Sequence, residues 1–194
     1  MEVILIRHYP TPGNRKRQYI GRTDEAIDES GITNLPVFQA ERVIASPMRR
    51  CIQTAALLFP DQEISEAEEL RECDFGLFEG KTYEQLKEEP VYVEWLESGG
   101  MIPFPEGEDP AAFRRRCADG VRDAIRSLMK EGVQSVAFVV HGGTIMSALE
   151  ALSEEDRGFY HWQVKNGEGY LAFADEREWE AGEEKLRRIR KTER

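Results

Sequence analysis

The chain has 194 residues, of which 40% are hydrophobic, so it can bury one substantial core but is too short to predict a second full domain. We therefore expect residues 1–194 to form a single domain. The net charge of −11 argues against a nucleic-acid partner and against an anionic membrane, because phosphate-rich surfaces would repel the protein. A small anion can still bind in a local positive pocket.

The cysteines and the apolar segments indicate in which cellular compartment the protein is expected. Three cysteines, odd in number and widely spaced, indicate neither a disulfide framework nor a zinc ribbon; they are Cys51, Cys73 and Cys117. Residues 1–7 lack the basic start and long apolar stretch of a signal peptide, and the longest apolar run, residues 136–140, is too short to span a bilayer. We expect a cytoplasmic protein without a membrane partner, either a monomer or a homodimer.

The first part of the chain predicts two strands and a helix. Residues 3–6 are a continuous apolar run that ends in charge, which is typical of a buried strand in a parallel sheet. A polar loop with several glycines follows over residues 8–34, and residues 42–45 predict a second strand. Residues 46–58 predict a helix that opens with serine as N-cap and proline in its first turn.

The middle of the chain predicts an excursion and the longest helix. Turn signals and two short helices, over residues 83–87 and 92–96, indicate a lid-like excursion over residues 73–108. An Asp-Pro pair then opens a helix over residues 109–130, where apolar residues recur at three- and four-residue spacing.

The last part completes an α/β pattern. Residues 136–140 are the clearest buried strand, a helix follows through Leu152, and residues 170–173 predict another strand. This alternation predicts a three-layer α/β/α sandwich with a mostly parallel sheet. The charged extension over residues 176–194 indicates a solvated face without chemistry, formed by a helix with Glu–Arg pairs or by an edge hairpin turning near Gly182.

Two of the three histidines share one design, because His8 and His141 each appear where an apolar strand ends. Ligands of open α/β sheets bind at the carboxyl ends of the strands, so this pair predicts a functional site. Arg7 precedes His8, and either Arg49 or Arg50 lies near the same edge at the start of a helix. Guanidinium groups match phosphate oxygens, and the site is therefore expected to bind an anion.

A zinc site is the alternative, with His8, His141 and His161 as three ligands. Arg7 argues against it, because a fixed cation beside a metal ion costs Coulomb energy. We expect His161, next to Trp162, to pack or cap instead, and we expect no metal.

Six motifs in order resemble those of the histidine phosphatase superfamily, in the branch that contains the cofactor-dependent phosphoglycerate mutases and the α-ribazole phosphatases. They cover residues 3 to about 175 and are Leu5-Ile6-Arg7-His8 with Asn14, Tyr19-Ile20-Gly21-Arg22-Thr23-Asp24, Ser46-Pro47-Met48-Arg49-Arg50-Cys51-Ile52-Gln53-Thr54-Ala55, Leu70-Arg71-Glu72, Phe78-Glu79-Gly80 and Val140-His141-Gly142-Gly143. The resemblance implies a phosphoglycerate mutase-like fold.

The resemblance also implies the catalytic roles. His8 would accept the phosphate covalently, Arg7, Arg50 and His141 would hold the phosphoryl oxygens, and Glu72 would donate the proton. The expected function is a metal-independent phosphomonoesterase that needs no cofactor. Its partner would be a small phosphomonoester, with α-ribazole phosphate as the candidate. The alternatives are phosphoglycerate mutase-type transfer and a catalytically weak relative that only binds phosphate.

By the same resemblance, Asn14 and Gly21 would contact the phosphate or the substrate, and Gly142 would form the turn behind the second histidine, while Arg49 would face solvent. Aromatic faces after Glu72 suit a ring-bearing leaving group, and they belong to Phe75, Phe78 and Tyr83. A cationic clamp for a carboxylate would have to come from residues 114–116.

The chain departs from the family pattern in three places. Tyr9-Pro10 follows the nucleophile and stiffens the loop. The connection over residues 31–46 is short, so that its helix is expected to shrink to a turn or two. Residues 72–83 lack the lysine that mutases use for the substrate carboxylate, and a long mutase-type insertion is absent, which favours a phosphatase.

Overall fold

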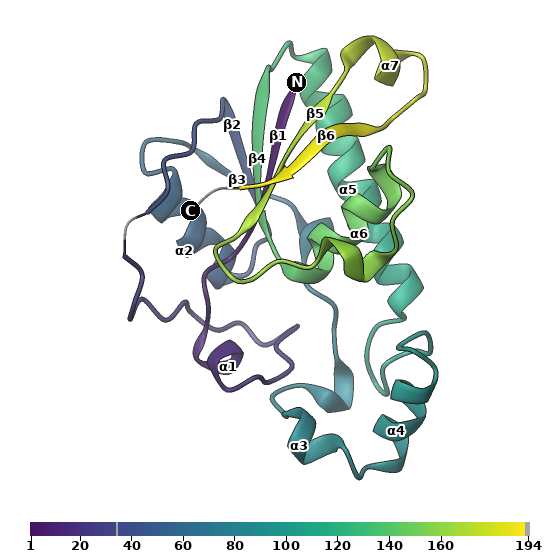
Figure 1. Ribbon diagram of the computed structural model, residues 1–194. Coiled ribbons are helices and arrows are strands. Elements are labelled where there is room, and N and C mark those ends of the chain that lie inside the picture. Colours follow the sequence, from purple (N-terminus) through teal and green to yellow (C-terminus); the bar gives the residue numbers. More distant parts are fainter. Residues whose placement is uncertain (34, 193–194) are drawn as a thin grey trace.

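A computed structural model describes residues 1–33 and 35–192 of the chain (Figure 1). Its centre is a six-stranded sheet in the order β3-β2-β4-β1-β5-β6. Strands β3, β2, β4 and β1 are mutually parallel, whereas β5 runs antiparallel to β1 and β6 antiparallel to β5. The strand bounds are β1 (Glu2–Arg7), β2 (Arg42–Ala45), β3 (Ile64–Glu66), β4 (Ser135–Val140), β5 (Gly169–Ala174) and β6 (Leu186–Lys191).

Helices cover both faces of the sheet (Figure 1). Successive residues of a strand point to opposite faces. Val3 and Leu5 pack with the long helices α5 and α6, whereas Ile4 and Ile6 pack with α2. The predicted three-layer α/β/α sandwich with a mostly parallel sheet is therefore confirmed. The helices are α1 (Pro12–Arg15), α2 (Arg49–Leu58), α3 (Tyr83–Leu86), α4 (Pro90–Glu97), α5 (Pro110–Lys130), α6 (Gly142–Leu152) and α7 (Glu176–Glu180), with 3-10 turns at Glu68–Leu70, Gly76–Phe78 and Phe159–Trp162.

The predicted start of α2 is wrong by two residues. The helix begins at Arg49, and its N-cap is Met48, which makes no side-chain capping bond. Ser46 lies before the helix, and its hydroxyl lies 2.8 Å from a ring nitrogen of His141. A tertiary partner thus competes with the local capping role for the same oxygen.

The later part of the connection between β1 and β2 is also plainer than expected. Its described residues, 31–33 and 35–41, contain no helix, where a turn or two of helix was predicted. Pro36 lies within this connection and restricts the backbone of the residue before it. Conversely, the short elements α1 and β3 were not predicted, because neither is long enough to show a periodic pattern.

The charged extension is part of the sheet rather than only a solvated face. β6 pairs with β5 as an edge strand, after a turn in which Gly182 has a φ of +87°, so the hairpin alternative is the correct one. Trp179 of α7 and Leu186 of β6 are buried in the core beside α5 and α6. Arg187 of β6 pairs with Glu178 of α7 at 2.6 Å.

Residues 73–108 extend beyond the carboxyl ends of the parallel strands, below the sheet in Figure 1. They contain α3 and α4 and have an apolar cluster of their own, in which Phe78, Tyr92 and Phe104 pack with Phe113 of α5. We call residues 73–108 the excursion. None of the helices in residues 1–33 and 35–192 combines the length and the apolar character needed to cross a membrane.

Candidate active site

Two histidines lie side by side at the edge of the sheet. β1 and β4 are adjacent and parallel, with Arg7 opposite Val140, so the residues that follow them meet. The rings of His8 and His141 have centroids 5.2 Å apart and an interplanar angle of 68°. Both side chains are buried, with exposed fractions of 3% and 0%. The pairing of the two strands thus brings together the histidines singled out in the sequence.

The His8 ring has a defined tautomer when it is neutral. Its Nδ1 atom lies 2.7 Å from the carbonyl oxygen of Tyr9, which can only accept a hydrogen bond, so Nδ1 carries the proton. Burial holds the pKa of His8 well below its usual value, and the nearby charges of Arg50 and Arg7 lower it further. The Nε2 atom therefore presents a free lone pair.

His141 is held by polar groups of the second strand and its helix. Its Nε2 atom lies 2.8 Å from the Ser46 hydroxyl and 3.5 Å from the Cys51 thiol. Burial lowers the pKa of His141 well below its usual value, with Arg50 and His8 as further causes. The ring is thus neutral at ordinary pH.

Arg50 is completely buried, whereas its neighbour Arg49 is exposed. Its two terminal nitrogens donate to backbone carbonyls, Nη1 to Thr23 at 2.8 Å and Nη2 to Gly21 at 2.9 Å. Its Nε atom is buried and has no hydrogen-bond partner. The arginine that enters the site is therefore Arg50.

A second orphaned donor belongs to Arg7. Its Nη1 atom donates to the Val164 carbonyl at 2.7 Å, but its Nε atom is buried and unpartnered, as in Arg50. Buried polar groups are nearly always bonded, so two such N–H groups call for a ligand. Their charge and fork geometry fit the oxygens of a phosphate group.

Glu72 is partly exposed and, together with Arg7, lines a cavity of about 660 Å³. The Cys73 amide donates to its Oε1 atom at 3.0 Å. Burial raises the pKa of Glu72, whereas that amide and the charges of Arg50 and Arg7 oppose the rise. A carboxyl group with a raised pKa can hold a proton for a leaving group.

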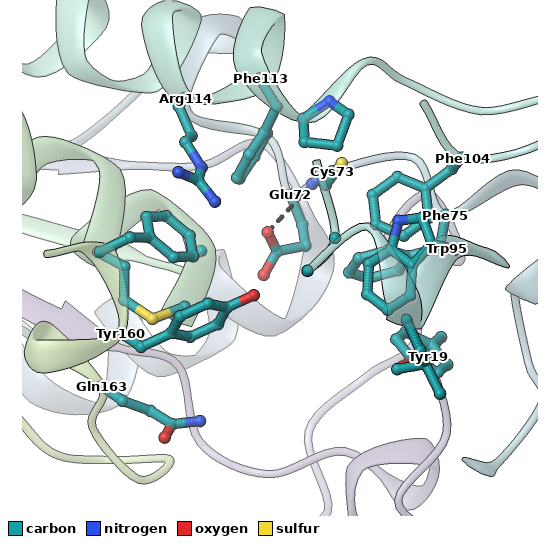
Figure 2. A pocket seen from close by; sticks show the side chains of 18 of the residues that line it. Tyr19, Glu72, Cys73, Phe75, Trp95, Phe104, Phe113, Arg114, Tyr160 and Gln163 are labelled. Carbon is teal, nitrogen blue, oxygen red and sulfur yellow. Dashed lines mark hydrogen bonds between the residues drawn. The ribbon is translucent and has the colours of Figure 1, made fainter. Parts of the chain in front are cut away.

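The cavity has two walls (Figure 2). The excursion and residue 19 supply an aromatic wall, and α5 and the 3-10 turn after α6 supply the opposite one, with Glu72 between them. In Figure 2 the Tyr160 hydroxyl points towards Glu72. The aromatic side chains that line the cavity are Tyr19, Phe75, Trp95, Phe104, Phe113, Phe159 and Tyr160.

The expected aromatic and cationic residues separate in the structure. Of the three aromatic residues expected to face a ring, Phe75 lines the cavity, Phe78 is buried within the excursion, and Tyr83 is 53% exposed outside the lining. Of the basic residues 114–116, only Arg114 lines the cavity. It lies 3.9 Å above the Phe159 ring.

The predicted substrate-binding residues lie around the histidines in different roles. The described side-chain hydrogen bonds of Asn14 use its Oδ1 atom, which accepts from the Thr11 amide and from the Asn166 side chain, so they leave the side-chain Nδ2 group as a donor. Gly142 opens α6, where a Cβ would lie 3.3 Å from the Arg7 guanidinium. Gly142 thus lies against the Arg7 guanidinium, and Asn14 is linked through Asn166 to the His8 carbonyl.

Gly21 lies between Glu79 and Arg50. Its amide donates to the Glu79 carboxylate at 3.0 Å and its carbonyl accepts from Arg50. A Cβ at this position would lie 1.8 Å from the Cys73 carbonyl, so only glycine fits. Gly21 therefore supports the position of Arg50, and its expected contact with the phosphate or the substrate stays a prediction.

Sequence reasoning gave no role to two residues that support the site. Asn166 donates to the His8 carbonyl at 3.0 Å, and Glu79 accepts hydrogen bonds from the loop that holds Arg50. Glu79 was visible as part of a family motif, whereas Asn166 carried no signal of its own. Residues whose hydrogen-bond partners are distant in the sequence can be assigned a role only once the fold is known.

The part of the chain that the structure describes contains no group of three His, Cys, Asp or Glu residues able to hold a metal ion. His161 is exposed and packs edge-on against Trp162, with ring centroids 4.8 Å apart. This is the packing role expected for it.

The fold and the site define an α/β protein with a phosphate-like anion site beside a neutral histidine. The family model of the Histidine phosphatase superfamily (branch 1) matches residues 3–185. The chain belongs to this family and is a phosphatase. It is 29% identical over 170 residues to a broad-specificity phosphatase of Saccharomyces cerevisiae, covering 80% of this chain and 72% of that protein.

Solved structures share the fold. The α-ribazole phosphatase from Shigella flexneri matches with a TM-score of 0.77 and 24% identity, over 90% of this chain and 91% of that one. A phosphoserine phosphatase from Entamoeba histolytica, solved with 3-phosphoglyceric acid, matches with a TM-score of 0.76 and 22% identity, over 99% and 98%. These similarities establish the architecture and leave the substrate open.

Proposed function

We propose that this phosphatase hydrolyses small phosphomonoesters in two steps, through a phosphohistidine at His8 and without a metal ion. The observation that carries the proposal is the pair of buried, unpartnered Nε atoms of Arg7 and Arg50 beside a histidine whose Nε2 atom has a free lone pair. Two fixed cations supply the charge that magnesium supplies in many phosphoryl-transfer enzymes.

In the first step, Arg7, Arg50 and His141 hold the phosphoryl oxygens. The Nε2 atom of His8 forms a bond to phosphorus as the bond from phosphorus to the ester oxygen breaks. Glu72 gives its proton to that oxygen, so the leaving group departs as a neutral alcohol. The electron pair of the broken bond stays on the leaving oxygen.

In the second step, Glu72 is a carboxylate and accepts a proton from water. The water oxygen bonds to phosphorus as the bond to Nε2 of His8 breaks, which releases inorganic phosphate and restores the neutral ring. Both residues return to their starting protonation states. The cycle consumes one water and one phosphomonoester.

We further propose that the leaving group carries a ring, with α-ribazole phosphate as the named candidate. The cavity of about 660 Å³ exceeds what a three-carbon acid fills, and aromatic side chains dominate its walls. Phosphoglycerate mutase-type transfer is the alternative. It would need a cationic side chain to bind the substrate carboxylate. Arg114 is the arginine of the cavity lining that is available for this, because Arg7 is assigned to the phosphate.

Partition of a common intermediate tests the two-step reaction. Hydrolysis is run in water with an added alcohol, and phosphate and alkyl phosphate are quantified for several aryl esters. A phosphohistidine predicts one product ratio for all esters, because water and alcohol then compete for the same species. Ratios that change with the leaving group would instead show direct attack by water and would reject the proposal.

A further inference from the structure

Glu79 lies at the end of the 3-10 turn Gly76–Phe78, outside the cavity lining, and collects donors from two segments. Three of them belong to the loop over residues 21–23. They are the Gly21 amide at 3.0 Å, the Arg22 amide at 2.9 Å and the Thr23 hydroxyl at 2.8 Å. A single carboxylate thus fixes this loop.

The other side of the same loop holds Arg50. The Gly21 carbonyl and the Arg22 amide form one peptide unit, whose oxygen accepts from Nη2 of Arg50 at 2.9 Å. Its N–H group points to Glu79. This peptide unit lies between an anion and a cation with its dipole aligned to both, and hydrogen bonds in such a chain strengthen one another.

This arrangement also compensates a buried charge. Arg50 is fully buried, and its described hydrogen bonds all go to backbone carbonyls, from residues 20, 21 and 23. A buried cation needs negative charge or dipoles nearby. Glu79 is the carboxylate that orients two of these peptide dipoles, because it accepts from the Gly21 and Arg22 amides.

A fourth donor connects Glu79 to the other half of the site. The Phe75 amide donates to it at 3.2 Å, three residues after Glu72. Gly21 also packs directly against the Cys73 carbonyl. The carboxylate therefore joins the loop that holds Arg50 to the segment that carries the proposed proton donor.

We infer that Glu79 is a positioning residue, which acts through the Gly21–Arg22 peptide to hold the Arg50 guanidinium with its Nε atom free for the substrate phosphate. The inference rests on the proposed phosphate-binding role of Arg50. Glu79 touches neither substrate nor the reacting atoms.

The test is the isosteric variant Glu79→Gln, which keeps the shape and one carbonyl oxygen but loses the charge. We expect kcat/KM to fall about tenfold and the inhibition constant of vanadate to rise by a similar factor, because a misplaced guanidinium binds the phosphoryl group less well. Glu79→Ala should lower kcat/KM about a hundredfold. The control is Glu41→Gln, an exposed carboxylate that accepts the Gln134 amide at 3.2 Å and lies outside the site.

A double-mutant cycle separates positioning from a general structural role. In an Arg50→Ala background, adding Glu79→Gln should change kcat/KM less than about twofold, because the group that Glu79 positions is gone. A full tenfold fall in that background, or a lowered unfolding temperature with unchanged vanadate inhibition in Glu79→Gln alone, would overturn the inference. Wild-type vanadate inhibition in Arg50→Ala alone would instead reject the phosphate-binding role of Arg50, and with it the premise.

Discussion

The Nδ1 atom of His8 lies 2.7 Å from the carbonyl oxygen of its own neighbour, Tyr9. The Tyr9 amide in turn donates to the Thr54 hydroxyl at 2.9 Å, which anchors the backbone of Tyr9 to α2. The Tyr9-Pro10 pair, a departure from the family pattern, therefore stiffens the element that fixes the tautomer of His8. The free Nε2 atom is a consequence of backbone geometry.

The first prediction concerns His8→Ala, which should lower turnover to background, a loss of roughly 10⁵-fold or more. No acid-labile phosphate label should form on this variant in rapid-quench experiments with a labelled ester. The control is His161→Ala, since this histidine is exposed against Trp162 and should label like the wild type. Rapid labelling that survives His8→Ala would assign the nucleophile elsewhere.

The second prediction compares two adjacent arginines. Arg50→Ala should lower kcat by about 10²- to 10³-fold, because it removes a fixed cation from the phosphoryl group. Arg49→Ala should change kcat less than about twofold, since Arg49 is exposed.

Removal of metal ions is a related test of the same charges. Dialysis against EDTA should leave wild-type activity unchanged, and vanadate should inhibit it. Loss of activity on dialysis with recovery on adding zinc or magnesium would favour the metal alternative.

The third prediction concerns Glu72→Gln, which cannot protonate a leaving alkoxide. Alkyl phosphates should lose about 10²- to 10⁴-fold in rate, whereas nitrophenyl phosphate, whose leaving group needs no proton, should lose far less. The slope of a plot of log rate against leaving-group pKa should therefore be steeper for Glu72→Gln than for the wild type. Glu69→Gln, at an exposed carboxylate nearby, is the control. Equal losses on all esters would indicate a structural role for Glu72.

The fourth prediction is a pH profile. His8 acts as the neutral ring, and its pKa is lowered, so kcat/KM should rise with pH only well below 6.5. Glu72 acts first as the acid, and burial raises its pKa above the usual carboxyl value near 4.5. We therefore expect kcat/KM for alkyl phosphates to fall as the pH rises through this raised pKa.

Comparison with Glu72→Gln isolates the alkaline limb of that profile, because ionisation of the substrate phosphate near pH 6 affects both enzymes equally. The difference between the two profiles should disappear when nitrophenyl phosphate is the substrate. An acidic limb centred at or above pH 6.5 would contradict the neutral, buried environment of His8.

Local patterns were sufficient for the sheet and for the histidines. The apolar runs that became β1 and β4 are continuous and end in His8 and His141, so strand pairing alone places the two rings together. The start of helix α5 was predicted within one residue, because its N-cap is a local interaction. The Asp109 carboxylate accepts a hydrogen bond from the Ala112 amide. Signals of this kind involve residues a few positions apart.

The supporting residues could not be predicted in the same way. Glu79 and Gly21 are 58 positions apart in two irregular segments, where no periodicity indicates a contact. Ser46 has a side chain that suits a local N-cap, yet it contacts His141, 95 positions away. β3 is three residues long with no buried side chain, so its sequence lacks the alternation that identifies a strand.

The last prediction concerns the substrate. If the aromatic wall binds a ring, kcat/KM should be higher for α-ribazole phosphate than for ribose phosphates, and higher for these than for phosphoserine or 3-phosphoglycerate. A ring stacked on an aromatic side chain gains about 0.5–1.5 kcal/mol of binding free energy beyond that from its buried area. A carboxylate that enters this cavity must instead lose its hydration to pair with Arg114, whose guanidinium already contacts Phe159 and Glu150.

Tyr160 tests this preference without disturbing the core, because it lines the cavity and is 62% exposed. Tyr160→Ala should raise KM for α-ribazole phosphate about three- to tenfold, the loss of one aromatic contact, and leave KM for glycerol phosphate unchanged. Tyr83→Ala is the matched control, since Tyr83 is 53% exposed and lies outside the cavity lining. A clear lead for phosphoserine or 3-phosphoglycerate in steady-state comparison would reject the ring preference and make Arg114 the residue to test, because a carboxylate would then need its charge.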